Sequence, residues 1–245
     1  MPNLFESKKT VAIINIAMLA VLSGSLVANQ VYASKLKQHL GIYGNNFFGN
    51  LLKKFGGNVK LSGSIGEDAV KLAYAQGIPD MYGAELNVNF DEVQRSMDIM
   101  KQFDPTYGAT KLDLSAEDMK RYINIALRIS CEFCCGAKSI IDATGEAACG
   151  CAHSQAMRGL AAYLIKNHGA HYTDDQVLRE LARWKGKYFP KQMVKKMSDQ
   201  LQSGNYTPDI AALLLDLKLP KYSADGKSAP LPSEIDNADS MVGGC

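Results

Sequence analysis

The sequence lacks the local motifs that mark the commoner enzyme classes. It contains no glycine-rich phosphate loop, no Gly-x-Ser-x-Gly turn and no His-Glu-x-x-His pair, so it gives no support to phosphate-loop, hydrolase or zinc-protease chemistry. It also lacks a charge excess, because its formal net charge is only +2. A protein without a basic excess has no general attraction to polyanions, and we therefore expect no nucleic-acid partner.

Charge is also missing from one long stretch near the N-terminus. Residues 11–31 carry no charged side chain and are long enough to cross a bilayer as a helix. Residues 1–33 are therefore either a membrane anchor or a signal segment cleaved after Ala33. We favour the anchor, because the uncharged run is longer than a usual signal core. The membrane is then a predicted partner through residues 11–31, with the globular part outside the cytoplasm; cleavage would make the protein secreted.

The remaining chain of this 245-residue protein divides into three parts. Residues 34–66 are rich in glycine and asparagine and predict a linker. Residues 67–220 predict a helical domain with a cysteine-rich site at 131–153. Residues 221–245 predict an extended tail ending in Cys245. The expected fold is therefore mainly α: a helical bundle with a cysteine-rich hairpin or loop between two helices, preceded by the N-terminal membrane helix.

Apolar spacing and end signals place the helices of that domain. Ser115 with Asp118, and Thr173 with Gln176, are typical of helix starts in which a hydroxyl caps backbone amides. Thr207 followed by Pro208 is a third start signal. The predicted helices cover Glu67–Gln76, Asp91–Gln102, a segment from Ser115 toward Cys131, one around Met157–Ile165, one from Thr173 to before Pro190, one from Met193 to Gly204, and one that starts at Thr207-Pro208 and runs through Ile210 to Leu217.

Cysteine supplies the strongest signal of chemistry. The chain has six cysteines, and all but Cys245 lie in the pattern Cys131-x-x-Cys134-Cys135, then Cys149-x-Cys151-x-His153. Soft thiolates with an imidazole are the ligands of zinc, copper(I) and iron–sulfur clusters. We predict a transition-metal site, zinc or copper(I) first and an iron–sulfur cluster as a further candidate. The predicted ligands are Cys131, Cys134, Cys135, Cys149, Cys151 and His153.

Two local features support this site. A turn at Thr144-Gly145 would fold the two cysteine groups toward one another as a hairpin. Cys151 precedes a predicted helix, whose N-terminal amides and dipole favour thiolate over thiol. Arg158 and Asp142 lie close enough in sequence to orient the ligands. His168 and His171 are weaker ligand candidates in a polar turn.

Several functions are compatible with these residues. Zinc needs four ligands whereas six are present, so a dinuclear site, a cluster and a free reactive thiol are all compatible with the sequence. Cys245, which follows two glycines, is a candidate additional thiol. A metal-binding protein with a structural or metal-handling role is the first hypothesis, with a protein partner left open. The alternatives are a thiol–disulfide oxidoreductase, a structural interaction protein with a zinc-stapled loop, and plain disulfides. Nothing in the sequence requires enzyme activity.

One family resemblance accompanies the pattern. A helix leading into Cys131-Glu-Phe-Cys134, a further helix, and the stretch YTDDQVLRELARWKGKYFP resemble the membrane-anchored helical thiol domain of cytochrome c maturation, over a minor part of the chain. That resemblance implies thiol reduction by Cys131 and Cys134, whereas the other cysteines and His153 are additional to the family's motif. The cluster also resembles cysteine-rich extracytoplasmic lipoproteins of bacteria suspected of binding copper, with a different order and spacing of thiols.

Overall fold

The computed structural model describes residues 59–222 and 232–244. The predicted membrane anchor or signal segment at 1–33, most of the predicted linker and Cys245 lie outside the described residues. Within the two described ranges, no helix has the length and apolar character that a membrane crossing requires.

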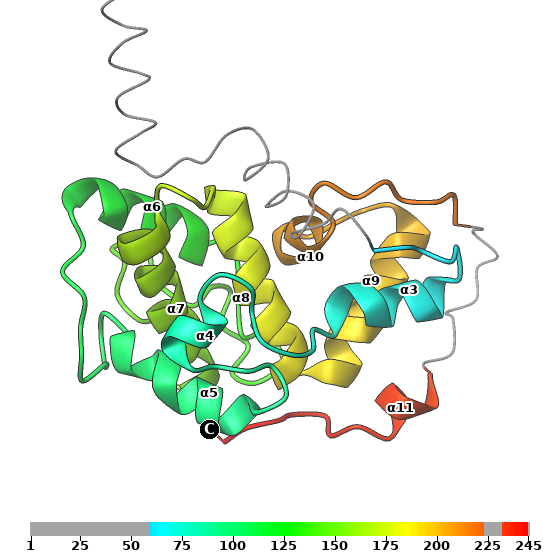
Figure 1. The fold of residues 1–245 in the computed structure, drawn as a ribbon, viewed down its shortest axis with the longest axis horizontal. Helices are drawn as coiled ribbons and strands as arrows, with labels where there is room; N and C mark the ends of the chain where they lie inside the picture. The colour runs from blue at the N-terminus through cyan, green and yellow to red at the C-terminus, as the bar shows by residue number, and fades with distance from the viewer. Residues whose placement is uncertain (1–58, 223–231, 245) are drawn as a thin grey trace, which may run out of the picture. The chain divides into compact units, whose positions relative to one another are not determined.

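The described residues are mainly helical, which confirms the mainly α character of the predicted fold (Figure 1). The elements in chain order are α3 (Ile65–Ala73), α4 (Gly83–Leu86), α5 (Val93–Met100), the short 3-10 helix η1 (Lys101–Phe103), α6 (Ala116–Ala126), α7 (Ala152–His168), α8 (Asp174–Tyr188), α9 (Pro190–Ser203), α10 (Pro208–Leu213) and α11 (Ser233–Asp236).

The predicted helix starts are confirmed by their caps. The Ser115 side chain accepts a hydrogen bond from the Asp118 amide at the start of α6. Thr173 and Gln176 form a reciprocal capping box at the start of α8, which satisfies two backbone amides that the helix itself leaves without partners. Helix α9 ends at its C-cap Gly204, which has the left-handed conformation that glycine adopts without steric cost.

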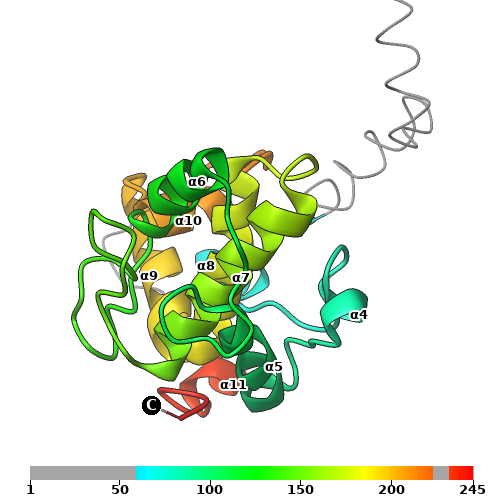
Figure 2. The same ribbon diagram turned by 90° about the vertical axis from the view of Figure 1, so that its left-hand side faces the viewer.

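Helix α7 forms the centre of the domain. Every residue from Ala156 to Ile165 is buried, and α7 packs against α5, η1, α6 and α8, as Figure 2 shows for α5 and α6. Gly159 allows the closest of these contacts, since a Cβ atom there would lie 2.0 Å from the carbonyl oxygen of Met100. A helix covered on all sides needs apolar residues all round, so α7 is less one-sided than the other helices.

A second group of helices surrounds α8. Helices α9 and α10 both pack on α8, and α3 packs on α9, beside which it lies in Figure 1. Gly186 lets α8 pass close to the end of α3, where a Cβ atom would lie 1.9 Å from the carbonyl oxygen of Ala73. Trp184 of α8 donates a hydrogen bond to the hydroxyl of Tyr82, which in turn donates to Glu180, and all three side chains are buried.

The described C-terminal segment lies against this core. Its short helix α11 packs on α9 with Ile235 buried. Farther on, the amide of Val242 donates a 2.8 Å hydrogen bond to the carbonyl of Tyr188, and the amide of Gly244 donates to the Gln94 side chain at 3.0 Å. Within the predicted extended tail, residues 232–244 are therefore hydrogen-bonded to both α5 and the end of α8.

Candidate metal centre

All five described cysteines lie between α6 and the N-terminal end of α7, and all are thiols rather than disulfides. At the start of this loop, the carbonyl of Cys131 accepts hydrogen bonds from the amides of Cys134 at 3.1 Å and Cys135 at 3.4 Å. The two amides bond to the same carbonyl, as they would in a single turn of a helix. This turn therefore places Cys134 beside Cys131, and the thiol of Cys135 also reaches the Cys131 carbonyl, at 3.9 Å.

The loop between the two cysteine motifs is organised by Asp142. Its carboxylate accepts hydrogen bonds from the amide of Thr144 at 2.8 Å and from the amide of Glu146 at 3.1 Å, and Gly145 has a positive φ of 94°. A single antiparallel bridge joins Ile141 to Ala147. The predicted turn is present, but in the described residues it carries no strand pair, so the hairpin is not confirmed.

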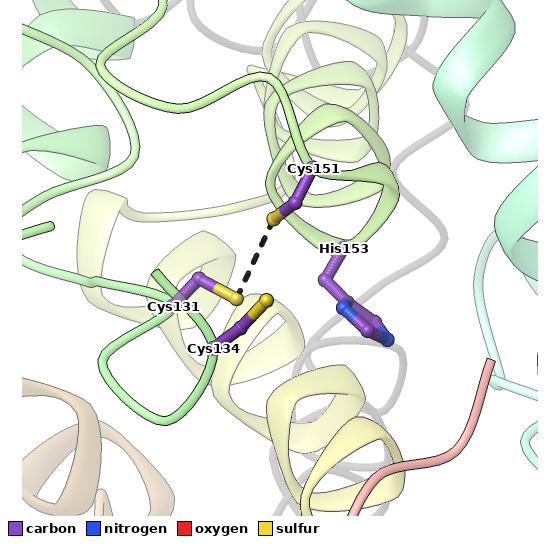
Figure 3. A group of neighbouring side chains, drawn as sticks. All are labelled: Cys131, Cys134, Cys151 and His153. Carbon is purple, nitrogen blue, oxygen red and sulfur yellow. Dashed lines mark hydrogen bonds between the residues drawn. The ribbon is translucent and has the colours of Figure 1, made fainter. Parts of the chain in front are cut away.

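Four of the predicted ligands converge on one small volume. Cys131, Cys134, Cys151 and His153, here called the Cys3His group, have ligand atoms all within 4.8 Å of one another. Figure 3 shows the three sulfur atoms directed toward one another, with the His153 ring beside them. These residues could hold a metal ion.

One distance in the group can be compared with metal geometry. The sulfur atoms of Cys131 and Cys151 are 3.7 Å apart. A disulfide requires about 2.05 Å, whereas two sulfurs bound to one tetrahedral zinc at about 2.3 Å each lie about 3.8 Å apart. The spacing therefore suits two ligands of one ion, and without an ion it suits a thiol that donates a hydrogen bond to a thiolate.

Cys135, Cys149 and Cys151 form a second convergent set, here called the three-thiol group. Their sulfur atoms also lie within 4.8 Å of one another. The amide of Cys151 donates to the sulfur of Cys149 at 3.5 Å. Cys151 thus belongs to both groups, and the two groups together contain every ligand predicted between residues 131 and 153.

Cys151 is the residue most strongly activated by its surroundings. It is the N-cap of α7, and its sulfur accepts a hydrogen bond from the Ser154 amide at 3.4 Å, as the predicted helix start implied. A hydrogen bond from the Cys131 thiol, and further ones from His153 and Ser154, outweigh burial and hold the pKa of Cys151 well below its ordinary value. The hydrogen bond with Cys151, together with burial, raises the pKa of the Cys131 thiol.

His153 is held in an orientation that suits a metal ligand. Its Nε2 lies 3.0 Å from the carbonyl oxygen of Val242, and its buried ring packs on Tyr188 and Phe189, with centroids 4.8 and 5.0 Å away. A carbonyl oxygen can only accept, so Nε2 carries a proton, and Nδ1 is the nitrogen that would bind a metal ion after losing any proton that it shares with the Cys151 sulfur. Fixing a ligand histidine through a carbonyl on its other nitrogen is the usual arrangement around metal sites.

Arg158 ties the loop to the core. Its guanidinium pairs with the carboxylate of Asp104 through bonds of 2.9 and 2.6 Å, and both side chains are fully buried. The same guanidinium donates to the carbonyl oxygens of Ile140 at 3.0 Å and Cys149 at 2.9 Å. Arg158, which was predicted to orient the ligands, holds the backbone carbonyl of Cys149. Asp142, for which the same was predicted, orders the turn through Thr144 and Glu146.

A charged cluster anchors the other side of the loop. Glu132, between Cys131 and Cys134, accepts hydrogen bonds from Lys185 at 3.0 Å and Lys196 at 2.7 Å. Both lysines also contact Asp209, and Lys185 is almost completely buried. Burial alone would raise the pKa of Asp209, but the two lysines outweigh it and hold that pKa well below its usual range.

Acid should weaken this anchor. A carboxylate whose pKa is lower in the folded state stabilises the fold above its unfolded pKa of about 3.9, and that contribution fades as the pH falls toward the folded pKa. We expect Asp209→Asn to lower the free energy of unfolding by about 1.5–3 kcal/mol at pH 7. The deficit relative to the unsubstituted protein should shrink below about pH 5. Urea unfolding of both proteins at several pH values measures this deficit in the free energy of unfolding. A deficit that does not change with pH would contradict the role of Asp209 as a charged anchor.

The remaining predicted thiol and the weaker candidates lie elsewhere. Cys245 is outside the described residues. His168 donates a hydrogen bond from Nε2 to the Glu85 carboxylate at 3.0 Å. Neither His168 nor His171 belongs to a convergent ligand group in the described part of the chain. Asp104, Lys185 and Val242 support the site without having been predicted. None of the three carried a sequence signal for its contact, because each contact joins segments that lie far apart in the chain.

Comparisons with protein-family models, with curated protein sequences and with solved structures find no match to this chain.

Proposed function

We propose that this protein is a membrane-tethered thiolate metal-binding protein, whose Cys3His group binds one zinc ion. The observation that carries the proposal is the convergence of four soft ligand atoms within 4.8 Å. Three thiolates and one imidazole form a complete tetrahedral ligand set for zinc. The uncharged run at residues 11–31 is the basis for the proposed membrane tether.

The arrangement of the four ligands favours a closed zinc site over an iron–sulfur cluster. Cys131 and His153 are buried, Cys151 is half-buried and Cys134 is exposed, but four protein ligands fill a tetrahedron and leave no position for a substrate. Common iron–sulfur clusters take four thiolates instead, and the three sulfurs of this group fall short of that number. A zinc ion here would join the loop after α6, the start of α7 and, through His153, the C-terminal segment at Val242.

Two histidines provide a matched test. His153→Gln should remove one chelator-resistant zinc per chain, because glutamine is not a usual zinc ligand and a tetrahedral site with three thiolates exchanges more readily. His168→Gln should retain that zinc, since His168 contacts Glu85 and belongs to neither ligand group. Elemental mass spectrometry of anaerobically purified variants, after gel filtration with a chelator, measures both. Equal zinc retention in the two variants would contradict the proposal.

Thiol–disulfide exchange is the second candidate, and one observation favours it. The thiol of Cys131 lies 3.7 Å from the sulfur of Cys151, whose pKa is lowered, and a low-pKa thiolate beside a second thiol is the usual arrangement for disulfide exchange. The reactive pair would then be Cys131 with Cys151. Metal-free protein with one reducible Cys131–Cys151 disulfide, found by mass spectrometry of peptides, would favour this function over zinc binding.

A further inference from the structure

The three-thiol group remains after zinc has been assigned to the Cys3His group. Cys135 and Cys149 supply two further sulfur atoms within 4.8 Å of Cys151, and neither is a member of the first group. Cys135 is exposed and Cys149 is half-buried. A purely structural zinc site needs no such pair of additional thiols beside it.

We propose that Cys151 bridges two metal ions and that the three-thiol group binds a second, exchangeable ion of the thiolate-seeking class. The inference rests on the proposed zinc function of the Cys3His group and extends it. A thiolate sulfur has several lone pairs and can bind two ions at once, so one shared cysteine is sufficient to join the two groups. In this arrangement Cys151 lies at the centre of a dinuclear thiolate site.

The coordination of the second ion would differ from that of the first. Three sulfurs converge on it, so one position of a tetrahedron stays open, as in sites that exchange ligands. The exposed side chain of Cys135 places that position at the surface. An ion there can be passed to or taken from another thiol carrier, which would make the protein a metal-handling protein in addition to a zinc-stabilised one.

The loop backbone supports the second set as firmly as the first. Cys149 is fixed through its carbonyl by the buried Arg158 at 2.9 Å and through its sulfur by the Cys151 amide at 3.5 Å. Cys135 is placed by the turn on the Cys131 carbonyl.

Two neighbouring cysteines supply the matched variants for a test. The full chain is stripped of metal anaerobically, titrated with Zn²⁺ alone as the probe, and examined by native mass spectrometry before and after a chelator chase. We expect two zinc ions per chain, one lost quickly and one retained. Cys135→Ser and Cys149→Ser should bind a single retained ion. Cys134→Ser should lose the retained ion, and Cys151→Ser should lose both.

The outcomes separate the two proposals. Saturation of the unsubstituted chain at one zinc ion, with Cys135→Ser unchanged from it, would overturn the second position while leaving the Cys3His zinc intact. Two ions that survive Cys135→Ser would also overturn it, because the second ion would then use other ligands. Absence of retained zinc in the unsubstituted chain would overturn the proposed zinc function, and with it the bridged site.

Discussion

Removal of zinc is expected to lower the melting temperature of this protein by about 8–16 °C. Binding to the folded state alone contributes about 4 kcal/mol when free zinc exceeds the dissociation constant a thousandfold, and each kcal/mol shifts the midpoint of a domain of this size by about 2–4 °C. The physical reason is that the Cys3His ligands come from the loop after α6 and the start of α7, with His153 also hydrogen-bonded to Val242. Thermal unfolding followed by circular dichroism, with buffered zinc and with a chelator, measures the shift.

Helical content should survive zinc removal. Helices α7 and α8 are buried along most of their length, and they meet the metal ligands only at their ends, at His153 and Tyr188, so the core retains its hydrophobic stabilisation. The Cys151→Ser variant is the control, because it lacks the shared ligand and should melt at one temperature with or without zinc. A zinc-dependent shift in that variant equal to that of the unsubstituted protein would show that the ion binds elsewhere.

Arg158→Met is expected to destabilise the fold by about 3–5 kcal/mol, the range found when one member of a buried ion pair is removed. The substitution leaves the carboxylate of Asp104 buried without its partner, because both side chains are fully buried in the pair. It also removes the donors to the carbonyls of Ile140 and Cys149. Chemical denaturation of the zinc-free protein measures the loss without a contribution from metal binding.

A surface arginine provides the comparison. Arg95 pairs with Glu92 at 2.7 Å, but 48% and 50% of the two side chains are exposed, so Arg95→Met should cost about 1 kcal/mol or less. A second variant combines Arg158→Met with Asp104→Leu, which removes both buried charges and should recover part of the loss. Equal destabilisation by Arg158→Met and Arg95→Met would contradict a structural role for the buried pair.

The helices could be predicted because their signals are local. Ser115 and Thr173 cap backbone amides within three residues of themselves, and glycine or proline ends α8 and α9 where the chain cannot continue the helix. Helix α7 was harder to describe from periodicity. Its apolar spacing predicted one buried face, whereas Ala156–Ile165 is buried on all sides, because tertiary contacts from α5, α6 and α8 cannot be read from a single segment.

The ligands of the candidate site could also be predicted, because thiolate and imidazole chemistry depends on residue type and short spacing. Their division into two groups could not. Cys134 and Cys135 are neighbours in sequence but belong to different groups, and that separation depends on the turn around the Cys131 carbonyl. Cys151 was one ligand among six in the sequence, and only the geometry makes it the shared one.

The contacts that support the site could not be predicted from the sequence, because they join segments that lie far apart in the chain. Asp104 meets Arg158 across 54 residues, and Glu132 meets Lys185 across 53 residues. No local pattern identifies such partners, and a buried lysine such as Lys185 contradicts the usual preference of that residue for the surface. A paired carboxylate makes its burial tolerable, and pairing of this kind is visible only in three dimensions.

The central claim is that Cys131, Cys134, Cys151 and His153 together bind one zinc ion. X-ray absorption at the zinc edge tests it most directly, on the Cys135→Ser variant loaded with one zinc equivalent so that a single site contributes. The account predicts three sulfur neighbours at about 2.3 Å and one nitrogen neighbour at about 2.0–2.1 Å. A shell dominated by oxygen and nitrogen, or one of four sulfurs without nitrogen, would contradict it.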